Sequence, residues 1–197
     1  MREFILKASK AFTRPFNLND LAGSGRIDLV CRCISNAFFI SEAIRKDVRF
    51  HAVLEGPPKP PKLISFFGEN LKRITPDERN IGAWINKAVN LGLDLEKNEE
   101  RIVGDGIKVS KKSFEELVKE KAKETQLIYL NPKGIDIREF EFEKNVCFVL
   151  GDHKGLPKNT ERLLDRIGAK RISVGKLTYL ASHVIVICHN ELDRKCL

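Results

Sequence analysis

Two arginines flank an aspartate near the start of a predicted helix, where their side chains could act together. In Gly25-Arg26-Ile27-Asp28-Leu29-Val30-Cys31-Arg32, Asp28 and Arg32 are four residues apart and share one helical face. A carboxylate can take a proton or organise a water, and arginine can stabilise a developing oxygen anion. Arg26 and Asp28 are therefore the candidate catalytic residues. A plain ion pair explains the same spacing, and the polar loop 17–20 is an alternative source of a base.

Three loops in the last third of the chain combine glycine with polar residues directly after predicted strands. They are Leu130-Asn131-Pro132-Lys133-Gly134, Leu150-Gly151-Asp152-His153-Lys154-Gly155-Leu156-Pro157 and Ser173-Val174-Gly175-Lys176-Leu177-Thr178. In open α/β sheets, ligands bind outside the carboxyl ends of the strands, where glycine lets the backbone approach closely. Each loop alone also fits a simple turn. Together the three predict one pocket.

Several other sites have no support in the sequence. No strand is followed by Gly-x-Gly-x-x-Gly, and no Gly-Lys-Ser/Thr phosphate loop is present. The five cysteines and four histidines show none of the short paired spacings of a zinc site, so we expect no metal and buried, reduced thiols. His153 and His183 fit structural roles better than acid–base roles. Single charges such as Lys10, Arg14, Lys59 and Lys62 could contact phosphate or lie on an ordinary surface.

The elements that position these residues follow from hydrophobic periodicity and turn signals. Strands are predicted at Glu3–Ala8, Val48–Leu54, Lys62–Phe67, Gln126–Leu130, Val146–Leu150 and Arg171–Val174, with a hairpin over 101–109 that turns at Asp-Gly. Helices are predicted at 27–40, after a Thr75 cap, after the capping box Ser113-x-x-Glu116, at 160–167 and at 180–190. The alternation of strands and helices in the last third predicts an α/β fold with mostly buried strands.

Composition sets the broad class of protein. The 197 residues fit a single domain, 1–197, and are 42% hydrophobic and 31% charged, as in an ordinary globular chain. No apolar run is long enough to span a bilayer and no export signal is evident, so we expect a cytoplasmic protein without membrane contact. The net charge of +8 favours an anionic partner such as nucleic acid, although solubility alone explains a charge of this size.

At two of these loops the residues resemble a known family. The runs 147–157 and 172–183 look like the signature of SPOUT methyltransferases, and the segments 25–32 and 187–193 resemble the TrmY family in particular. TrmY proteins are archaeal enzymes that methylate N1 of the pseudouridine at position 54 in the T-loop of tRNA. The resemblance runs from Lys7 to Leu192.

The resemblance implies a fold, a cofactor and partners. The fold would be a SPOUT-type α/β domain with a mostly parallel sheet and a C-terminal trefoil knot, with knot and donor site at about 126–193. The cofactor would be S-adenosyl-L-methionine, and the partners would be the T-arm of tRNA and a second copy of the chain in a homodimer. The donor-binding residues would be Leu130, Gly151, Ser173, Val174, Gly175, Lys176, Leu177, Thr178 and Cys188.

Other functions remain open at this point. A SPOUT enzyme of the same kind could act on a pseudouridine of ribosomal RNA or on another base. A knotted RNA-binding or assembly module with little catalysis is an alternative from a different class, and an unrelated α/β enzyme using another nucleotide is a third. An intact donor pocket would favour the enzyme.

Overall fold

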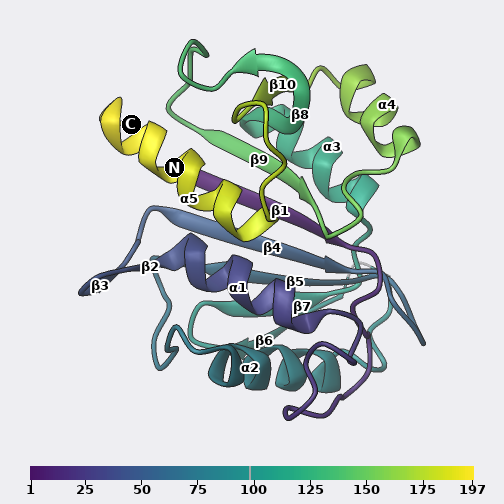
Figure 1. The fold of residues 1–197 in the computed structure, drawn as a ribbon. Coiled ribbons are helices and arrows are strands. Elements are labelled where there is room, and N and C mark those ends of the chain that lie inside the picture. The colour runs from purple at the N-terminus through teal and green to yellow at the C-terminus, as the bar shows by residue number, and fades with distance from the viewer. Residues whose placement is uncertain (98) are drawn as a thin grey trace.

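A computed structural model describes residues 1–97 and 99–197. Its main feature is one eight-stranded sheet in the order β10-β8-β9-β1-β4-β5-β7-β6, with helices on both faces (Figure 1). The strands are β1 Arg2–Ala8, β4 Val48–Leu54, β5 Lys62–Phe67, β6 Glu100–Gly104, β7 Ile107–Ser110, β8 Gln126–Asp136, β9 Val146–Gly151 and β10 Lys170–Ser173. The helices are α1 Ile27–Phe38, α2 Glu78–Leu91, α3 Phe114–Glu124, α4 Lys158–Arg166 and α5 Ala181–Arg194.

The sheet has a parallel and an antiparallel part. The four contacts among β10, β8, β9, β1 and β4 are parallel, and those among β4, β5, β7 and β6 are antiparallel. This confirms the predicted α/β class with a mostly parallel sheet. The predicted Asp-Gly hairpin joins β6 to β7, and Gly106 there has a φ of 72° that favours glycine.

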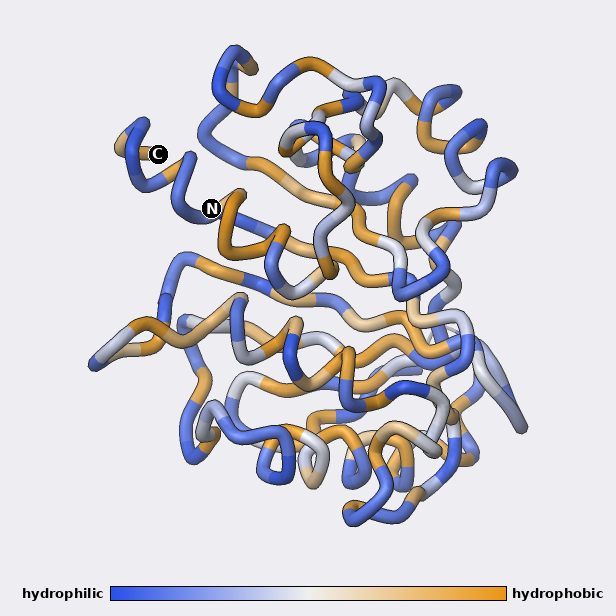
Figure 2. Tube along the Cα trace, viewed as in Figure 1, coloured by the Kyte–Doolittle hydropathy of each residue, from blue (hydrophilic) through white to orange (hydrophobic). Residues whose placement is uncertain are grey.

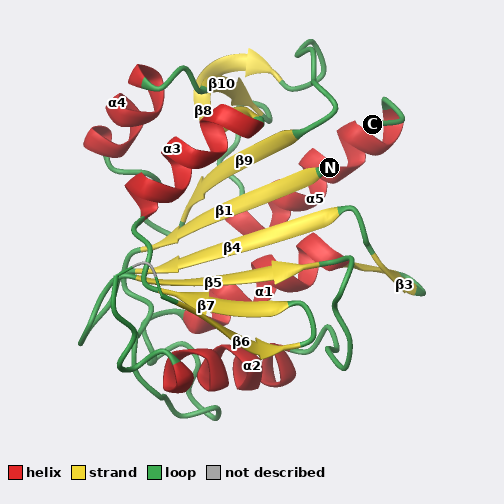
Figure 3. Ribbon diagram, turned by 180° about the vertical axis from the view of Figure 1, so that it is seen from behind, coloured by secondary structure: helices red, strands yellow, loops and turns green. Residues whose placement is uncertain are grey.

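Side chains of the central strands are buried on both sides of the sheet, as their continuous apolar runs predict. On one face, Phe4 of β1 and Phe148 of β9 pack in a core shared with α1, α2 and α5. On the other face, Ile5 and Val149 pack against α3 and α4. Seen from behind, α3 and α4 lie over the end of the sheet that holds β8, β9 and β10 (Figure 3), and hydrophobic residues concentrate along the strands (Figure 2).

Some boundaries differ from the sequence prediction. The first helix ends at Phe38 rather than residue 40, because Phe39–Ile40 (β2) pairs with Ala43–Ile44 (β3) in a short hairpin. Asp77, not Thr75, caps α2: its side chain accepts the amide of Asn80 at 2.8 Å. The predicted capping box of α3 is present, with Ser113 and Glu116 bonded to each other's backbone.

Two elements of the last third extend beyond their predicted ends. Strand β8 continues past Leu130 to Asp136, because β10 pairs first with Ile128 and Tyr129 and then, after a register shift, with Ile135 and Asp136. Helix α5 continues to Arg194 through a polar last turn.

The cysteine prediction holds for four of the five thiols. Cys31, Cys33, Cys147 and Cys188 are buried, and all five cysteines are free. Cys196 is exposed, so the expected burial is wrong there; it follows the end of α5, close to the end of the chain. None of the helices within the described ranges has the length and apolar character needed to cross a bilayer.

Candidate functional site

A cleft lies beside the middle of β8 and beyond the carboxyl end of β10, where the sequence predicts a ligand pocket. Its walls come from the middle of β8, from β10 with the segment that follows it, and from the first turn of α5. It encloses about 120 Å³ and is lined by Leu130, Asn131, Pro132, Ile172, Ser173, Val174, Gly175, Leu177, Thr178, Tyr179 and Val184. Residues of two of the three predicted loops therefore line one pocket, but the prediction that 130–134 is a loop is wrong, because these residues lie inside β8.

The chemistry of this lining fits an adenosine-type group. Leucine, isoleucine and valine side chains provide apolar walls for a flat ring, and the hydroxyls of Ser173 and Thr178 offer a few polar contacts. Gly175 has a φ of 123° with no atom within 4 Å of a Cβ built there, so its backbone faces open space. Ligand sites commonly enclose about 300–1,000 Å³. The cleft is smaller than that in this structure, and the segment 175–180 beside it is exposed.

The predicted donor residues fall into two groups. Leu130, Ser173, Val174, Gly175, Leu177 and Thr178 line the cleft, whereas Gly151, Lys176 and Cys188 do not. Lys176 is exposed, and Cys188 is fully buried in the core. Burial raises the pKa of the Cys188 thiol, which keeps it protonated and inert as a nucleophile.

Gly151 supports the cleft from the neighbouring strand end. A Cβ at this position would lie 2.3 Å from the carbonyl carbon of Gly155, so only glycine lets the loop after β9 fold back on itself. The next residue, Asp152, is 9% exposed and accepts the amide of Ser9 at 2.8 Å and its hydroxyl at 2.5 Å. The β9 loop is thereby fixed to the end of β1.

Five cleft residues were not among the predicted donor residues: Asn131, Pro132, Ile172, Tyr179 and Val184. Asn131 and Pro132 belong to a segment that the sequence predicts to form the pocket, and Ile172 and Tyr179 directly adjoin predicted donor residues. Val184 lies on α5, and its side chain reaches the cleft only because the helix packs beside β10; no local pattern indicates that contact.

The predicted catalytic pair forms a tight ionic network at the start of α1. The Arg26 guanidinium donates to both oxygens of Asp28, at 2.9 and 3.1 Å, and Arg32 donates to the same carboxylate at 2.6 Å. Arg32 also reaches Glu78 of α2 at 3.3 Å. Arg26 has a φ of 68°, an uncommon conformation for a residue with a side chain. The expected i, i+4 pair of Asp28 and Arg32 is confirmed.

The network determines what Asp28 can do. Burial raises the pKa of its carboxyl, but the hydrogen bonds from Arg26 and Arg32 outweigh that effect, and the pKa lies below its usual range. An ionised carboxylate with a lowered pKa is a weak proton acceptor and a strong anchor for a guanidinium. The geometry therefore suits Asp28 to hold Arg26 in place.

The structure places the other candidate residues of the sequence analysis outside the Asp28 network. In the polar loop, Asp20 accepts the amide of Gly23 at 2.8 Å and stabilises a turn. Lys62 is 2% exposed and donates to the carbonyl of Gly92, so the idea that it contacts phosphate is wrong. Lys10, Arg14 and Lys59 are exposed near the same edge as the cleft. Across residues 1–97 and 99–197, no group of three or more His, Cys, Asp and Glu side chains is arranged to hold a metal.

Known proteins share both the sequence and the fold. The family model described as "Putative SAM-dependent RNA methyltransferase" matches residues 1–197. The tRNA (pseudouridine(54)-N(1))-methyltransferase of Methanocaldococcus jannaschii is 47% identical over 99% of this chain and 98% of its own length. The protein of the same name from Thermococcus gammatolerans is 48% identical over 98% and 97%.

A solved structure shows the same fold at low identity. Archaeoglobus fulgidus Nep1 bound to S-adenosylhomocysteine superimposes with a TM-score of 0.63 at 16% identity, covering 98% of this chain and 97% of that one. The full-length family match and the near-50% identities confirm the resemblance to the TrmY family. The chain belongs to this family of S-adenosylmethionine-dependent RNA methyltransferases.

Proposed function

We propose that this enzyme transfers a methyl group from S-adenosyl-L-methionine to N1 of the pseudouridine at position 54 in the T-loop of tRNA. The observation that carries the proposal is the near-50% identity, over almost the whole chain, to enzymes named for that reaction. The cleft beside β8 and β10 supports it, because its lining suits the donor.

In this proposal the donor is held by the cleft residues together with the loop after β9. Leu130, Val174 and Leu177 contact its apolar parts, and Ser173, Gly175 and Thr178 provide polar contacts. Lys176 lies at the exposed rim of the segment, while Gly151 and Cys188 shape the cleft from behind. When bound, S-adenosylmethionine supplies a methyl group already activated on a sulfonium.

The protein's part in the chemistry is to hold the acceptor in line with that methyl and to manage one proton. As the N1–C bond forms, the N1 proton must leave, and negative charge develops on the ring oxygens. Arg26, anchored by Asp28, is placed to stabilise that charge. Because Asp28 stays ionised in its network, we assign it the positioning of Arg26 and of a water that takes the proton.

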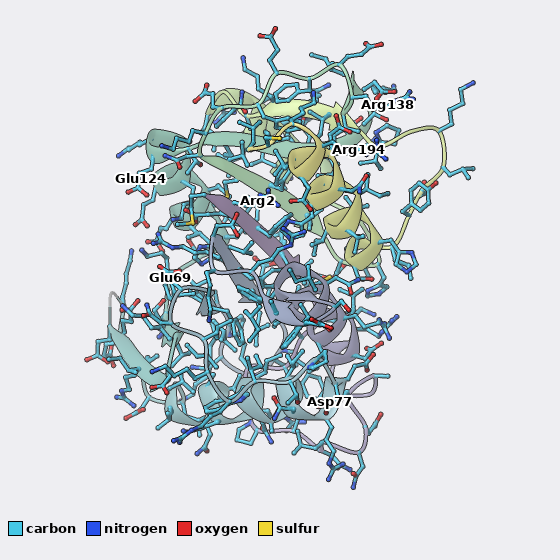
Figure 4. All side chains as sticks on the ribbon, turned by 90° about the vertical axis from the view of Figure 1, so that its left-hand side faces the viewer. Arg2, Glu69, Asp77, Glu124, Arg138 and Arg194 are labelled. Atoms are coloured by element: carbon cyan, nitrogen blue, oxygen red, sulfur yellow. The ribbon has the colours of Figure 1, made fainter. Side chains whose placement is uncertain are left out.

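The proposal includes a C-terminal knot within a single domain, 1–197. Residues 130–145 contact both β10 and the end of α5: the amide of Ile137 donates to Ser173 at 2.9 Å, and Lys195 donates to Phe140 at 2.9 Å. Arg138 of this segment and Arg194 of α5 lie in the same region of the molecule (Figure 4). A trefoil knot would form if the chain passed beneath the connection that residues 130–145 make.

We also propose a homodimer. The donor segment and α5 expose large apolar side chains: Leu177 71%, Tyr179 43%, Leu180 55% and Val186 49%. Exposed large apolar side chains of this kind are typical of an interface. Sedimentation at micromolar concentration should give about twice the chain mass of 22.4 kDa. A tRNA substrate supports a cytoplasmic location for the enzyme.

The test of the function compares two RNAs. Pseudouridine has a free N1–H because its sugar is attached through carbon, whereas N1 of uridine is occupied by the glycosidic bond. Single-turnover methyl transfer to a T-arm transcript with pseudouridine at position 54 should proceed, and the same transcript with uridine should stay unmodified. Equal rates on both RNAs would overturn the acceptor assignment. RNA binding without methylation would indicate a binding module.

A further inference from the structure

One stretch of β8 is contacted by helix α4 where its pairing with the sheet is interrupted. Strand β10 pairs with β8 at Ile128 and Tyr129 and then, after the register shift, at Ile135 and Asp136. Among the strands that the structure describes, the residues between them, 130–134, have no paired position in β10, and β8 pairs with β9 only before this stretch. Because a bulge of this size interrupts the hydrogen-bond ladder, the position of residues 130–134 depends on other contacts.

This stretch forms one wall of the donor cleft. Leu130 and Asn131 line the cleft on one side, and Ile172 and Ser173 of β10 line it on the other. The cleft thus lies where the two strands lose their pairing. The contacts that set the distance between residues 130–134 and β10 therefore also set the width of the cleft.

The first contact with α4 is made by Asn131. Its side-chain amide donates to a carboxylate oxygen of Glu161 at 3.0 Å, and its side-chain oxygen accepts the backbone amide of Lys133 at 2.9 Å. Both polar ends of the Asn131 side chain are therefore engaged, which restricts the side chain to one orientation. Glu161 lies in the first turn of α4, where the helix dipole favours an acidic side chain.

The second contact with α4 lies directly before the cleft. The hydroxyl of Tyr129, whose ring is fully buried, donates to Asp165 at 2.6 Å, and the Arg171 guanidinium donates to the same carboxylate at 3.0 Å. Burial and the hydrogen bond to Asp165 raise the pKa of Tyr129 to about 12, so its hydroxyl stays protonated and can donate. One carboxylate thereby joins the last paired residues of β8 and β10 to α4.

Gly134 lies at the far end of the stretch. A Cβ there would lie 2.6 Å from the carbonyl carbons of Arg171 and Ile172, so the two strands meet through backbone at this point. Glu161 and Asp165 are four residues apart and share one face of α4. The helix therefore fixes the beginning and the middle of the stretch, and β10 fixes its end.

We propose that Glu161 and Asp165 are positioning residues for the methyl donor, because they hold residues 130–134 at the distance from β10 at which S-adenosylmethionine binds. Neither residue lines the cleft: Glu161 acts through Asn131, and Asp165 acts through Tyr129 and Arg171. A wall that is fixed before the donor arrives loses less conformational entropy on binding. The inference rests on the proposed placement of the donor in this cleft.

Removal of the Glu161 carboxylate tests the first contact. Glu161→Ala should weaken S-adenosylmethionine binding about tenfold in calorimetry without RNA, the size expected for a lost hydrogen bond to a charged group. In methyl transfer, the KM for the donor should rise by a similar factor, while turnover at saturating donor and the KM for RNA stay unchanged. Glu161→Gln keeps an oxygen that can accept from Asn131 and should restore most of the affinity.

A double-mutant cycle separates positioning from general stability. If Glu161 acts through Asn131, Glu161→Ala should change donor affinity little in an Asn131→Ala background. A purely structural role predicts the same loss of affinity in both backgrounds. Full donor affinity in folded Glu161→Ala, or an equal loss with and without Asn131, would contradict the proposal.

Glu120→Ala is the matched control. Glu120 lies on α3, which packs on the same face of the sheet as α4, and its carboxylate accepts a hydrogen bond from Lys112 at 2.7 Å. It lies outside the cleft lining, so its removal should leave the KM for the donor unchanged. A rise equal to that of Glu161→Ala would show that the effect is not specific to α4.

Tyr129→Phe tests the second contact. The change removes only the hydroxyl and leaves Asp165 paired with Arg171. Donor affinity should fall about 3- to 10-fold, because the lost hydrogen bond is partly replaced by water at the half-exposed carboxylate. Full donor affinity in this variant would contradict the role of Asp165.

The proposed donor site and the role of α4 fail differently. If Gly175→Val loses donor binding while Glu161→Ala keeps it, the donor lies in the cleft and the role of α4 is wrong. If Gly175→Val also keeps donor binding, the donor lies elsewhere and the proposed site itself is wrong. Neither result depends on which nucleotide accepts the methyl group, because the calorimetry contains no RNA.

Discussion

The parallel and antiparallel parts of the sheet contain similar residues but place their loops differently. In the parallel part, the strands β10, β8, β9, β1 and β4 all finish at one edge, so their loops gather there. In the antiparallel part, strand ends alternate between the two edges, and β6 and β7 are joined by a tight turn. The cleft proposed for the donor and the cavity lined by Lys10, Arg26 and His153 both lie toward the edge where the parallel strands end.

Charged pairs show the same contrast. Lys108 and Glu100 pair at 2.7 Å across the β6–β7 hairpin, with both side chains more than 40% exposed. Such a pair contributes little beyond solubility. Asp28 has a side chain only 12% exposed and holds both Arg32 and Arg26, and Arg26 lines a cavity at the start of α1. An ion pair thus acquires a positioning role where burial restricts its partners and a cavity lies beside it.

The largest effect is expected from adding a side chain to a glycine at the edge where the parallel strands end. Gly151→Val would push into Gly155, and Gly175→Val would force a β-branched side chain into a φ of 123° in the wall of the cleft. Calorimetry should show S-adenosylmethionine binding lost in both variants. Gly168→Val is the control, since Gly168 also has a positive φ, 85°, and open space around it, but lies away from the cleft. It should lose stability and keep donor binding. Wild-type affinity in either Gly151→Val or Gly175→Val would move the donor site elsewhere.

Local patterns in the sequence predict the secondary structure well. The bounds of β4 and β5 match the prediction, because each is a continuous apolar run between turn residues. The capping box of α3 and the Asp-Gly turn are equally local. The β2–β3 hairpin was missed since Phe39 and Ile40 continue the helical pattern, and only pairing with residues 43–44 ends the helix.

Long-range contacts limit what the sequence says about the site. The sequence predicts that the segments around Leu130 and Ser173 share one pocket, although Leu130 lies inside β8 and not in a loop after it. The Ser9–Asp152 bonds join residues 143 positions apart, and no local pattern indicates them. The low pKa of Asp28 likewise depends on how both arginines fold around it, which spacing alone does not give.

The next test concerns Asp28 itself. Asp28→Asn keeps the size of the side chain but removes the charge that anchors Arg26, so turnover should fall by about a hundredfold, with donor and RNA affinity almost unchanged. Arg26→Ala should lower turnover and RNA affinity together, because Arg26 lines a cavity at the start of α1, where it can contact both a phosphate and the developing oxyanion. A plain ion pair predicts only about 1 kcal/mol of lost stability and normal turnover. Full activity of folded Asp28→Asn would remove the residue from the mechanism.

The pH profile of the same reaction separates anchor from base. Since the pKa of Asp28 lies below its usual range, the carboxylate stays ionised through the neutral and mildly acidic range. If Asp28 is an anchor, the Asn variant should lower the rate by the same factor at every pH in that range. If the wild-type rate changes with pH and the rate of the Asn variant does not, Asp28 is the titrating group.

The smallest expected effect is a loss of folding stability in acid, and it should be concentrated in the parallel part of the sheet. His189 of α5 is 3% exposed and contacts Arg2 of β1 at 3.3 Å and the carbonyl of Ala37 at 3.0 Å. Burial, with the charges of Arg45 and Arg2, lowers its pKa to about 4. Because the folded state holds this ring neutral, its contribution is complete above the unfolded pKa of about 6.5 and is lost as the pH falls toward 4.

The measurement is unfolding by denaturant at several pH values, with hydrogen exchange at pH 7 and pH 5. Stability of the wild type should fall between pH 6.5 and 4, and His189→Gln should flatten that part of the curve while lowering stability at pH 7. Amides of α5 and β1 should exchange faster at pH 5 relative to those of β5 and β7, because the strain of protonating His189 falls on the contact between α5 and β1. Equal acceleration of hydrogen exchange in both parts of the sheet would show that acid destabilises the whole fold. Protonation of His189 would then not act on the parallel part in particular.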